Sequence, residues 1–385
     1  MVDPYVGREQ TRAKHFILRR YLQALAFKVL TFSDIAYIDG FSGPWESKVD
    51  GFGDSSFMIA IGVLRDAQKK IFETKHIRRR IRCFFSETDA ESFGQLQRAV
   101  SPFHNPLEGF EIATYHGKFE NAVSDARAFA SDYFPLVFID PTGWTGYPLD
   151  KIRPLFLRPK CEVVINFMYE FVNRFSNSDD ESTVESLNPI LGGPGWRQRL
   201  DPTLPRGAAV ARLFRETLKT AGDFDFVVSA RIDKATAERP HYFITYATKS
   251  LDGLKAFRQA EYDALRVHVK VRASAKERRR EDHTHIRDLF SGHDAEVQEE
   301  ALDQIVEREM AVASTALLQM LEKDFELGFD VVVARLLEPF MLRETNVRDI
   351  CVSLAKEGKI EETWGGGNRK PRSTDTIRLR NKGAS

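Results

Sequence analysis

The sequence has few cysteines and no long apolar segment. Its three cysteines are far apart in a chain of 385 residues, which argues against a disulfide framework and against a zinc site built on cysteine. No apolar run approaches the roughly 18 residues of a transmembrane helix, and the N-terminus lacks the charged-then-apolar pattern of a signal peptide. We therefore expect a protein of the reducing cytoplasm, with no membrane among its partners.

The sequence also lacks net charge. Lysine plus arginine and aspartate plus glutamate both number 56, so no overall field draws the chain to nucleic acid or to an anionic membrane. Any such binding must come from local clusters of charge. Apolar residues make up 42% and charged residues 29%, as in a globular protein. At this length we expect two domains, or one large domain with an appendage.

Short apolar runs alternate with helical segments over the first two thirds of the chain. The runs are "DIAYID" (34–39), "IRCFFSE" (81–87), "FEIATYHG" (110–117), "LVFID" (136–140), "CEVVINFM" (161–168), "FDFVVSARI" (224–232) and "HYFITYATK" (241–249). Such alternation predicts a parallel sheet covered on both faces. Only a polar loop separates the last two runs, which predicts an antiparallel hairpin. The predicted fold is α/β, a Rossmann-like seven-stranded sheet with one antiparallel strand, the layout of class I methyltransferases.

The pattern divides the chain into three parts. Residues 1–257 form the predicted Rossmann-like domain, and residues 258–310 form a charged helical connector that contains "KERRRED". Residues 311–385 form a small domain in which Thr345 can cap a helix that Gly358 would end. Two β-like runs, "KIEETW" and "DTIRLR", then flank the basic loop "GGGNRKPRST".

Helix, turn, helix and a hairpin with a basic tip is the element order of a winged helix. A wing of this kind contacts the phosphate backbone of nucleic acid through basic side chains. The residues expected at that contact are Lys359, Arg369, Lys370 and Arg372. A winged helix used only for protein contact is the alternative.

Acidic residues end two of the predicted strands. Ligands of an open parallel sheet lie outside the carboxyl ends of its strands, near the switch point. Asp39 is followed there by "GFSG", whose glycines allow a tight turn and close approach to a ligand. Glu87 ends the next strand, where a carboxylate can accept hydrogen bonds from both hydroxyls of a ribose. The alternatives are a tight loop without a ligand and an acid that only precedes a helix.

The fourth apolar run ends in Asp140, followed by "PTGW". Asp140 is placed to orient a substrate, Pro141 fixes the direction of the chain, and Trp144 could form a wall for a planar substrate. An ordinary turn with a core tryptophan is the alternative. Two other clusters carry weaker signals: "KHIRRRIR" (75–82) could touch phosphates or be a solvated corner, and "HTHIRDLFSGH" has no completed set of metal ligands, so we expect no metal site there.

Six segments, in order, resemble the three-Cys-motif partner family (TcmP). They are "KHFILRRYLQAL" (14–25), "YIDGFSGPWE" (37–46), "FFSETD" (84–89), "VFIDPTGW" (137–144), "VINFMYEFVNRF" (164–175) and "YFITYATKSLDGLKAF" (242–257). The resemblance runs through most of residues 10–260, and the C-terminal part is also similar to the family's C-terminus. The "DGFSGP" and "IDP" elements are more distantly similar to ribosomal RNA adenine methyltransferases.

This resemblance implies a class I methyltransferase-like fold that binds S-adenosylmethionine (SAM). It also implies a radical-SAM-like three-Cys-motif protein as a partner. The cofactor contacts that it implies, together with the strand ends above, are Asp39, Gly40, Phe41, Gly43, Glu87, Thr88 and Phe119. The residues that it places on the substrate side are Asp140, Pro141 and Trp144.

Three departures from the family pattern bear on catalysis. Trp45 replaces the last glycine of DGFAGPG, Lys118 replaces the acid of GDF, and Thr142 replaces the aromatic of DPFGW or DPYGW. These changes weaken the case for methylation of a base amino group. Two hypotheses follow: a SAM-dependent methyltransferase-like enzyme acting on nucleic acid, and a non-catalytic adaptor that docks the partner and reaches DNA or RNA through the winged helix.

Overall fold

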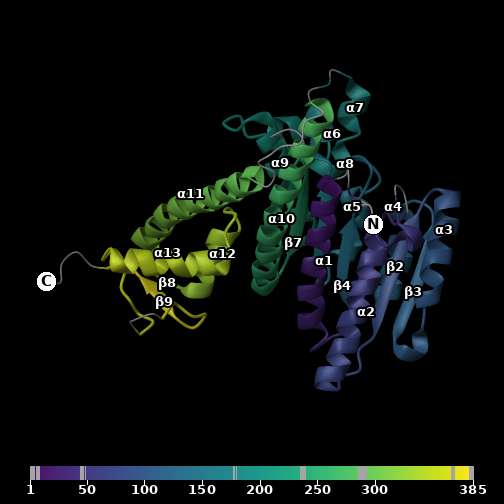
Figure 1. Ribbon diagram of the computed structural model, residues 1–385, viewed down its shortest axis with the longest axis horizontal. Helices are drawn as coiled ribbons and strands as arrows, with labels where there is room; N and C mark the ends of the chain where they lie inside the picture. The colour runs from purple at the N-terminus through teal and green to yellow at the C-terminus, as the bar shows by residue number, and fades with distance from the viewer. Residues whose placement is uncertain are drawn as a thin grey trace. The chain divides into compact units, whose positions relative to one another are not determined.

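The computed structural model describes residues 5, 9–43, 47, 49–176, 178, 180–234, 240–284, 293–365 and 369–380. The chain divides into two compact units, residues 1–250 and 251–385. In Figure 1 the first unit runs from purple through teal, and the second is green to yellow.

The first unit is built on a seven-stranded sheet with the order β3-β2-β1-β4-β5-β7-β6. The strands are β1 (Ile35–Asp39), β2 (Ile81–Glu87), β3 (Phe110–His116), β4 (Phe134–Ile139), β5 (Glu162–Phe167), β6 (Phe226–Asp233) and β7 (Pro240–Thr248). β1 to β5 pair in parallel, and β7 runs antiparallel to both β5 and β6. The predictions of a mostly parallel sheet and of a final antiparallel hairpin are therefore confirmed.

Helices cover both faces of the sheet (Figure 1). α1 (Glu9–Val29) and α2 (Ser56–Lys75) pack together, and α3 (Ala90–Val100) follows β2. The remaining helices of the unit are α4 (Phe119–Ala130), α5 (Leu149–Ile152), α6 (Tyr169–Phe175), α7 (Glu181–Glu185), α8 (Asn188–Leu191) and α9 (Arg206–Gly222). No helix among the described residues is both long and apolar enough to cross a membrane.

Successive strand residues point to opposite faces of the sheet, and this alternation decides where the site can form. Ile38, Val137 and Ile165 belong to the core that also contains buried residues of α4, α8 and α9. Residues one position away in each strand point to the other face, where α1 and α2 pack. The two faces are therefore lined by alternate residues of the same strands.

A buried polar cluster lies on the α1 face at the start of β5. Glu162 is 4% exposed, and its carboxylate accepts hydrogen bonds from the hydroxyls of Tyr21 on α1 and of Thr248 on β7. The Tyr21 hydroxyl also lies 2.6 Å from that of Tyr246. Burial raises the pKa of Glu162 to about 7, although these hydrogen bonds favour the charged form.

The second unit consists of helices and one small sheet. Its elements are α10 (Leu251–Thr284), α11 (His293–Asp324), β8 (Glu326–Gly328), α12 (Phe329–Leu337), α13 (Glu344–Lys356) and β9 (Thr376–Arg378). Residues 258–310 thus belong to two long helices, apart from 285–292, which lie outside the described residues. β8 pairs antiparallel with β9, and a single bridge joins Ile360 to Leu379.

Two local predictions for this unit need correction. "KIEETW" does not form a strand of the expected hairpin, since it contributes only the bridge at Ile360, and the partner of "DTIRLR" is β8. Thr345 is not the cap of its helix either: Arg343 is the N-cap of α13, and its backbone amide donates to the Asn346 side chain at 3.0 Å. Gly358, with a φ of 70°, follows the end of α13 as predicted.

An ion pair is buried inside the second unit. The Arg258 guanidinium donates to the Glu261 carboxylate at 2.6 Å, and both residues are at most 5% exposed. The same guanidinium donates to the carbonyls of Leu337 at 2.8 Å and of Glu338 at 3.0 Å. Arg258 on α10 therefore satisfies the carbonyl groups at the C-terminal end of α12.

Candidate functional site

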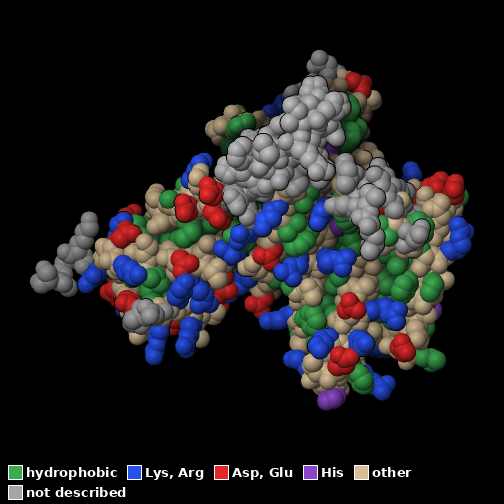
Figure 2. Space-filling view, in the orientation of Figure 1, with side chains coloured by type: hydrophobic (Ala, Val, Ile, Leu, Met, Phe, Trp, Pro, Cys, Tyr) green, Lys and Arg blue, Asp and Glu red, His purple; other side chains and the backbone are tan. Residues whose placement is uncertain are grey.

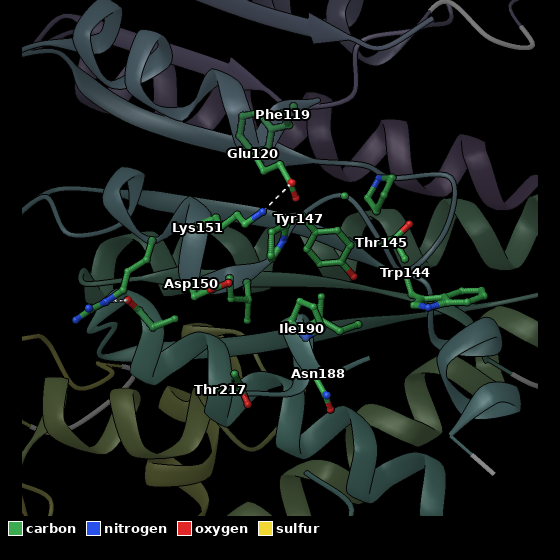
Figure 3. A pocket seen from close by; sticks show the side chains of 18 of the residues that line it. Phe119, Glu120, Trp144, Thr145, Tyr147, Asp150, Lys151, Asn188, Ile190 and Thr217 are labelled. Carbon is green, nitrogen blue, oxygen red and sulfur yellow. Dashed lines mark hydrogen bonds and ion pairs between the residues drawn. The ribbon is translucent and has the colours of Figure 1, made fainter. Parts of the chain in front are cut away.

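A pocket of about 1390 Å³ opens at the carboxyl ends of β1, β2, β3 and β4 (Figure 3). Its outer half is formed by the turns that follow these strands. The predicted residues that line it are Gly40, Phe41, Glu87, Thr88, Phe119, Pro141 and Trp144. The pocket continues beneath residues 142–148 toward α5, α8 and α9.

The turn after β1 is tied to the neighbouring segments. The Gly40 amide donates to the carbonyl of Phe138, and the Ser86 hydroxyl donates to the carbonyl of Gly40 at 2.9 Å. The Phe119 ring lies against Gly40 so closely that a Cβ atom there would be 2.7 Å from the ring. Glycine is required at position 40 because any side chain would displace this buried aromatic ring.

Glu87 stands in the wall of the pocket and is 3% exposed. Its Oε1 atom accepts hydrogen bonds from the backbone amides of Thr88 at 2.7 Å and Asp89 at 2.8 Å. Asp89, and not Glu87, caps α3 by accepting from the Ser92 amide. The two amides fix the orientation of the Glu87 carboxylate, so its place in the pocket does not depend on a ligand.

Asp39 does not line the pocket, because the alternation of β1 points it to the α1 face. Its carboxylate is fully buried and accepts from the Phe41 amide at 3.0 Å and from the Ser56 hydroxyl at 3.1 Å. Burial raises the pKa of Asp39 to about 7. Asp39 therefore shapes the turn. Gly43 is also not among the residues that line the pocket.

Asp140 lies outside the pocket lining as well, and protein groups bind both of its carboxylate oxygens. Lys14 on α1 donates to Oδ2 at 2.6 Å, and the Asn166 amide on β5 donates to Oδ1 at 2.7 Å. The side chains of Lys14 and Asp140 are 14% and 12% exposed. Reasoning from the sequence missed both partners. Asn166 could have been predicted, because it lies near the carboxyl end of β5, the strand next to β4 in the sheet.

Trp144 lines the pocket but is also held within the protein. Its indole nitrogen donates to the Ser186 hydroxyl at 2.9 Å, and its ring lies 4.5 Å from that of Phe175. Trp144 therefore both lines the pocket and packs within the protein, and its role toward a substrate stays a prediction. Trp45, the other tryptophan of the expected site, lies outside the described residues.

The inner half of the pocket was not predicted from the sequence. The aromatic ring of Tyr147 stands in it, with Ile190 from α8 and Leu213 and Thr217 from α9 (Figure 3). The hydroxyls of Tyr147 and Thr217 are buried and have no hydrogen-bond partner within the described part of the chain. No sequence motif marks these residues: Tyr147 lies in the connection between β4 and α5, and the others lie on helices that only apolar spacing defines.

The four basic residues of the expected wing lie in the second unit, and two of them are paired. Lys359 lies 2.7 Å from Glu357, and Lys370 forms an ion pair with Asp349. Arg369 and Arg372 are exposed. Figure 2 shows Lys and Arg side chains gathered over the part of this unit that carries β9, with acidic side chains beside them. Of the four expected residues, Arg369 and Arg372 are thus the two without an ion pair within the described part of the chain.

The other basic cluster, "KHIRRRIR", has structural contacts. Arg79 donates to the carbonyls of Leu30 and Thr31, and Arg80 pairs with Asp34. Arg82 also donates inside the protein, to a carbonyl at 2.9 Å. These contacts agree with the hypothesis that the cluster forms a corner of the fold. In the histidine-rich segment, residue 285 and the side chains of residues 283 and 293 lie outside the described part.

No protein-family model matches the chain, and no curated protein sequence matches it. Among solved structures, protein LPL1258 from Legionella pneumophila str. Philadelphia 1, of family model DUF519, is similar, with 9% sequence identity and a TM-score of 0.34. The similarity covers 61% of this chain and 85% of that protein. A likeness at this level bears on no residue of the site.

Proposed function

We propose that the first unit binds SAM in the pocket at the carboxyl edge and is a methyltransferase-like enzyme acting on nucleic acid. The observation that carries the proposal is the position of Glu87. A buried carboxylate of fixed orientation stands at the end of β2, in the same pocket as the Gly40 turn after β1. This is where a ribose of an adenosine-containing cofactor is bound in sheets of this kind.

The sheet topology supports the same proposal. The order β3-β2-β1-β4-β5 is that of doubly wound nucleotide-binding sheets, and the reversed β7 is the addition typical of class I methyltransferases. When bound, SAM supplies an electrophilic methyl group. Transfer of this group depends on alignment more than on acid–base catalysis, so an Asp140 held by Lys14 and Asn166 can serve by fixing the turn that carries Pro141.

The test is calorimetry of the full chain with SAM and with its demethylated product, S-adenosylhomocysteine. We expect both to bind, and we expect Glu87→Gln to weaken binding about tenfold or more, because the variant loses charged hydrogen bonds worth about 1.5–3 kcal/mol. Glu91→Gln, an exposed position on α3, is the control and should bind as the parent does. Absence of heat and of any thermal shift at saturating SAM would exclude the proposal.

A second proposal is an adaptor that does not catalyse. Lys14 and Asn166 already bind both oxygens of the Asp140 carboxylate, and Lys118 and Thr142 depart from the family pattern, which favours a protein without catalysis. The fold of the second unit favours the same proposal. The order α11, β8, α12, α13, bridge and β9 is compatible with a winged helix. In this proposal the chain docks a radical-SAM-like three-Cys-motif protein and contacts DNA or RNA through residues 359–372.

Arg369 and Arg372, the two arginines of the expected wing, allow a direct test of this adaptor proposal. Arg369→Glu combined with Arg372→Glu should weaken binding to duplex nucleic acid at least tenfold, regardless of sequence, and flatten its salt dependence. Lys359→Glu combined with Lys370→Glu changes the charge equally, but both lysines are already paired with acids, so it should have the smaller effect. The measurement is fluorescence anisotropy at several salt concentrations. If the parent and the arginine variant bind nucleic acid equally well, this surface does not contact nucleic acid, and the alternative of a surface for protein contact stands.

A further inference from the structure

The pocket is larger than one ligand needs. Its volume of about 1390 Å³ exceeds the range of about 300–1,000 Å³ that is usual for a small-molecule site. Its two halves also differ in chemistry. The outer half presents the Glu87 carboxylate and the Gly40 turn, and the inner half presents aromatic and aliphatic side chains together with several charged and polar ones.

The inner half contains a polar group that the protein leaves unsatisfied. Tyr147 is 0% exposed, and its hydroxyl has no hydrogen-bond partner among the described residues. Figure 3 shows this hydroxyl on the side of the ring that faces Ile190, among the side chains that line the pocket. A buried hydroxyl without a partner is costly to keep, and most such groups are paired in native proteins. The hydroxyl has almost no accessible surface, so a ligand in the inner half would supply the missing partner after a small shift of the Tyr147 side chain.

The charged side chains around the inner half have partners within the protein. Lys151 pairs with Glu120 at 2.9 Å, and Glu216 accepts from a neighbouring arginine. Arg153 and Arg199 donate to the carbonyls of Ala221 and Leu191. Asp150 is exposed at the rim. The uncharged part of the lining combines Trp144, Tyr147 and aliphatic side chains with the amide and hydroxyl groups of Asn188 and Thr217, which favours an uncharged ring with polar atoms.

We propose that the inner half binds an uncharged heteroaromatic ring of nucleobase size, with a hydrogen bond to the Tyr147 hydroxyl. A ring in the inner half lies beside the outer half, where we propose that SAM binds, so the ring is placed to accept the methyl group. This role rests on the proposed function, whereas the binding site itself does not. The same ring chemistry belongs to a base of nucleic acid and to a free heterocyclic molecule.

The experiment measures binding of adenine and cytosine, and separately of a single-stranded oligonucleotide, to the full chain with and without S-adenosylhomocysteine. We expect a free base or the oligonucleotide to bind without displacing S-adenosylhomocysteine. Tyr147→Phe should weaken this binding about three- to tenfold through loss of one hydrogen bond, with no loss of thermal stability. Tyr133→Phe is the matched control, because its hydroxyl is also buried and unpaired but does not line the pocket.

The outcomes separate the possibilities. Binding of the oligonucleotide that depends on Tyr147 identifies nucleic acid as the source of the ring, and Tyr147-dependent binding of free bases alone identifies a small molecule. If the bases bind through Tyr147 but S-adenosylhomocysteine does not bind at all, the ring site stands and the proposed function fails. Displacement of S-adenosylhomocysteine by the bases, equal binding by Tyr147→Phe, or no binding of any probe overturns the inference.

Discussion

Replacement of Arg258 by methionine is expected to destabilise the second unit by about 3–5 kcal/mol, the usual cost of breaking a buried ion pair on one side. The variant would leave the Glu261 carboxylate without its partner at 2.6 Å and remove the donor to the carbonyls of Leu337 and Glu338. The measurement is urea unfolding of the full chain, with hydrogen exchange of the α12 amides as the probe for this unit.

Two further variants show whether burial is the cause. Arg335→Met removes an exposed ion pair with Asp324 in the same unit and should cost no more than about 1 kcal/mol. The double variant Arg258→Met with Glu261→Met should be less damaging than Arg258→Met alone, since it leaves no unpaired buried charge. A double variant that loses as much stability as Arg258→Met alone, or more, would contradict this explanation.

The second large effect is on the pH dependence of the first unit's stability, through Glu162. The pKa of this carboxyl is about 7 in the folded protein and about 4.5 in an unfolded chain, so the folded state binds the extra proton between these values. Stability from this group is complete below pH about 4.5 and is lost as the pH rises through 7. The loss is on the order of 3 kcal/mol. Glu162→Gln keeps the shape of the side chain and should remove this part of the pH dependence.

The measurement is the free energy of unfolding of parent and Glu162→Gln between pH 5 and pH 8. We expect the variant to gain stability relative to the parent as the pH rises. Asp39 also has a raised pKa, so some pH dependence will remain in both proteins. Glu73→Gln, on the exposed face of α2, serves as the control and should keep the parent's slope. A Glu162 variant with the slope of the parent would show that this carboxyl does not titrate in the range.

Much of the fold could be predicted from the sequence because buried parallel strands are continuous apolar runs. All seven strands of the first unit fall within or beside the expected runs, and the short connection between the last two fixed their antiparallel pairing. β8 was missed because three residues, "ELG", are too few to show a pattern. That omission also produced the wrong partner for "DTIRLR".

The candidate site was predicted less completely. The rule that ligands bind at carboxyl ends of strands led to Gly40, Glu87 and Pro141, which do line the pocket. It also led to Asp39 and Asp140, which point to the opposite face of the sheet, where Asp39 meets α2 and Asp140 meets α1. Tyr147 and Ile190 could not be found in this way, because the spacing of apolar residues does not show whether a side chain meets another side chain or a cavity.

The turn after β1 depends on parts of the chain that are distant in sequence. The Gly40 amide donates a hydrogen bond to the carbonyl of Phe138, about 100 residues later, and the Ser42 amide donates to the carbonyl of Ser86. The ring of Phe119 packs against Gly40. During synthesis this turn therefore cannot take its final shape until β4 has left the ribosome. A chain that stops before β4 would have the glycine motif without the carbonyl of Phe138 that holds the turn, and so without the complete pocket.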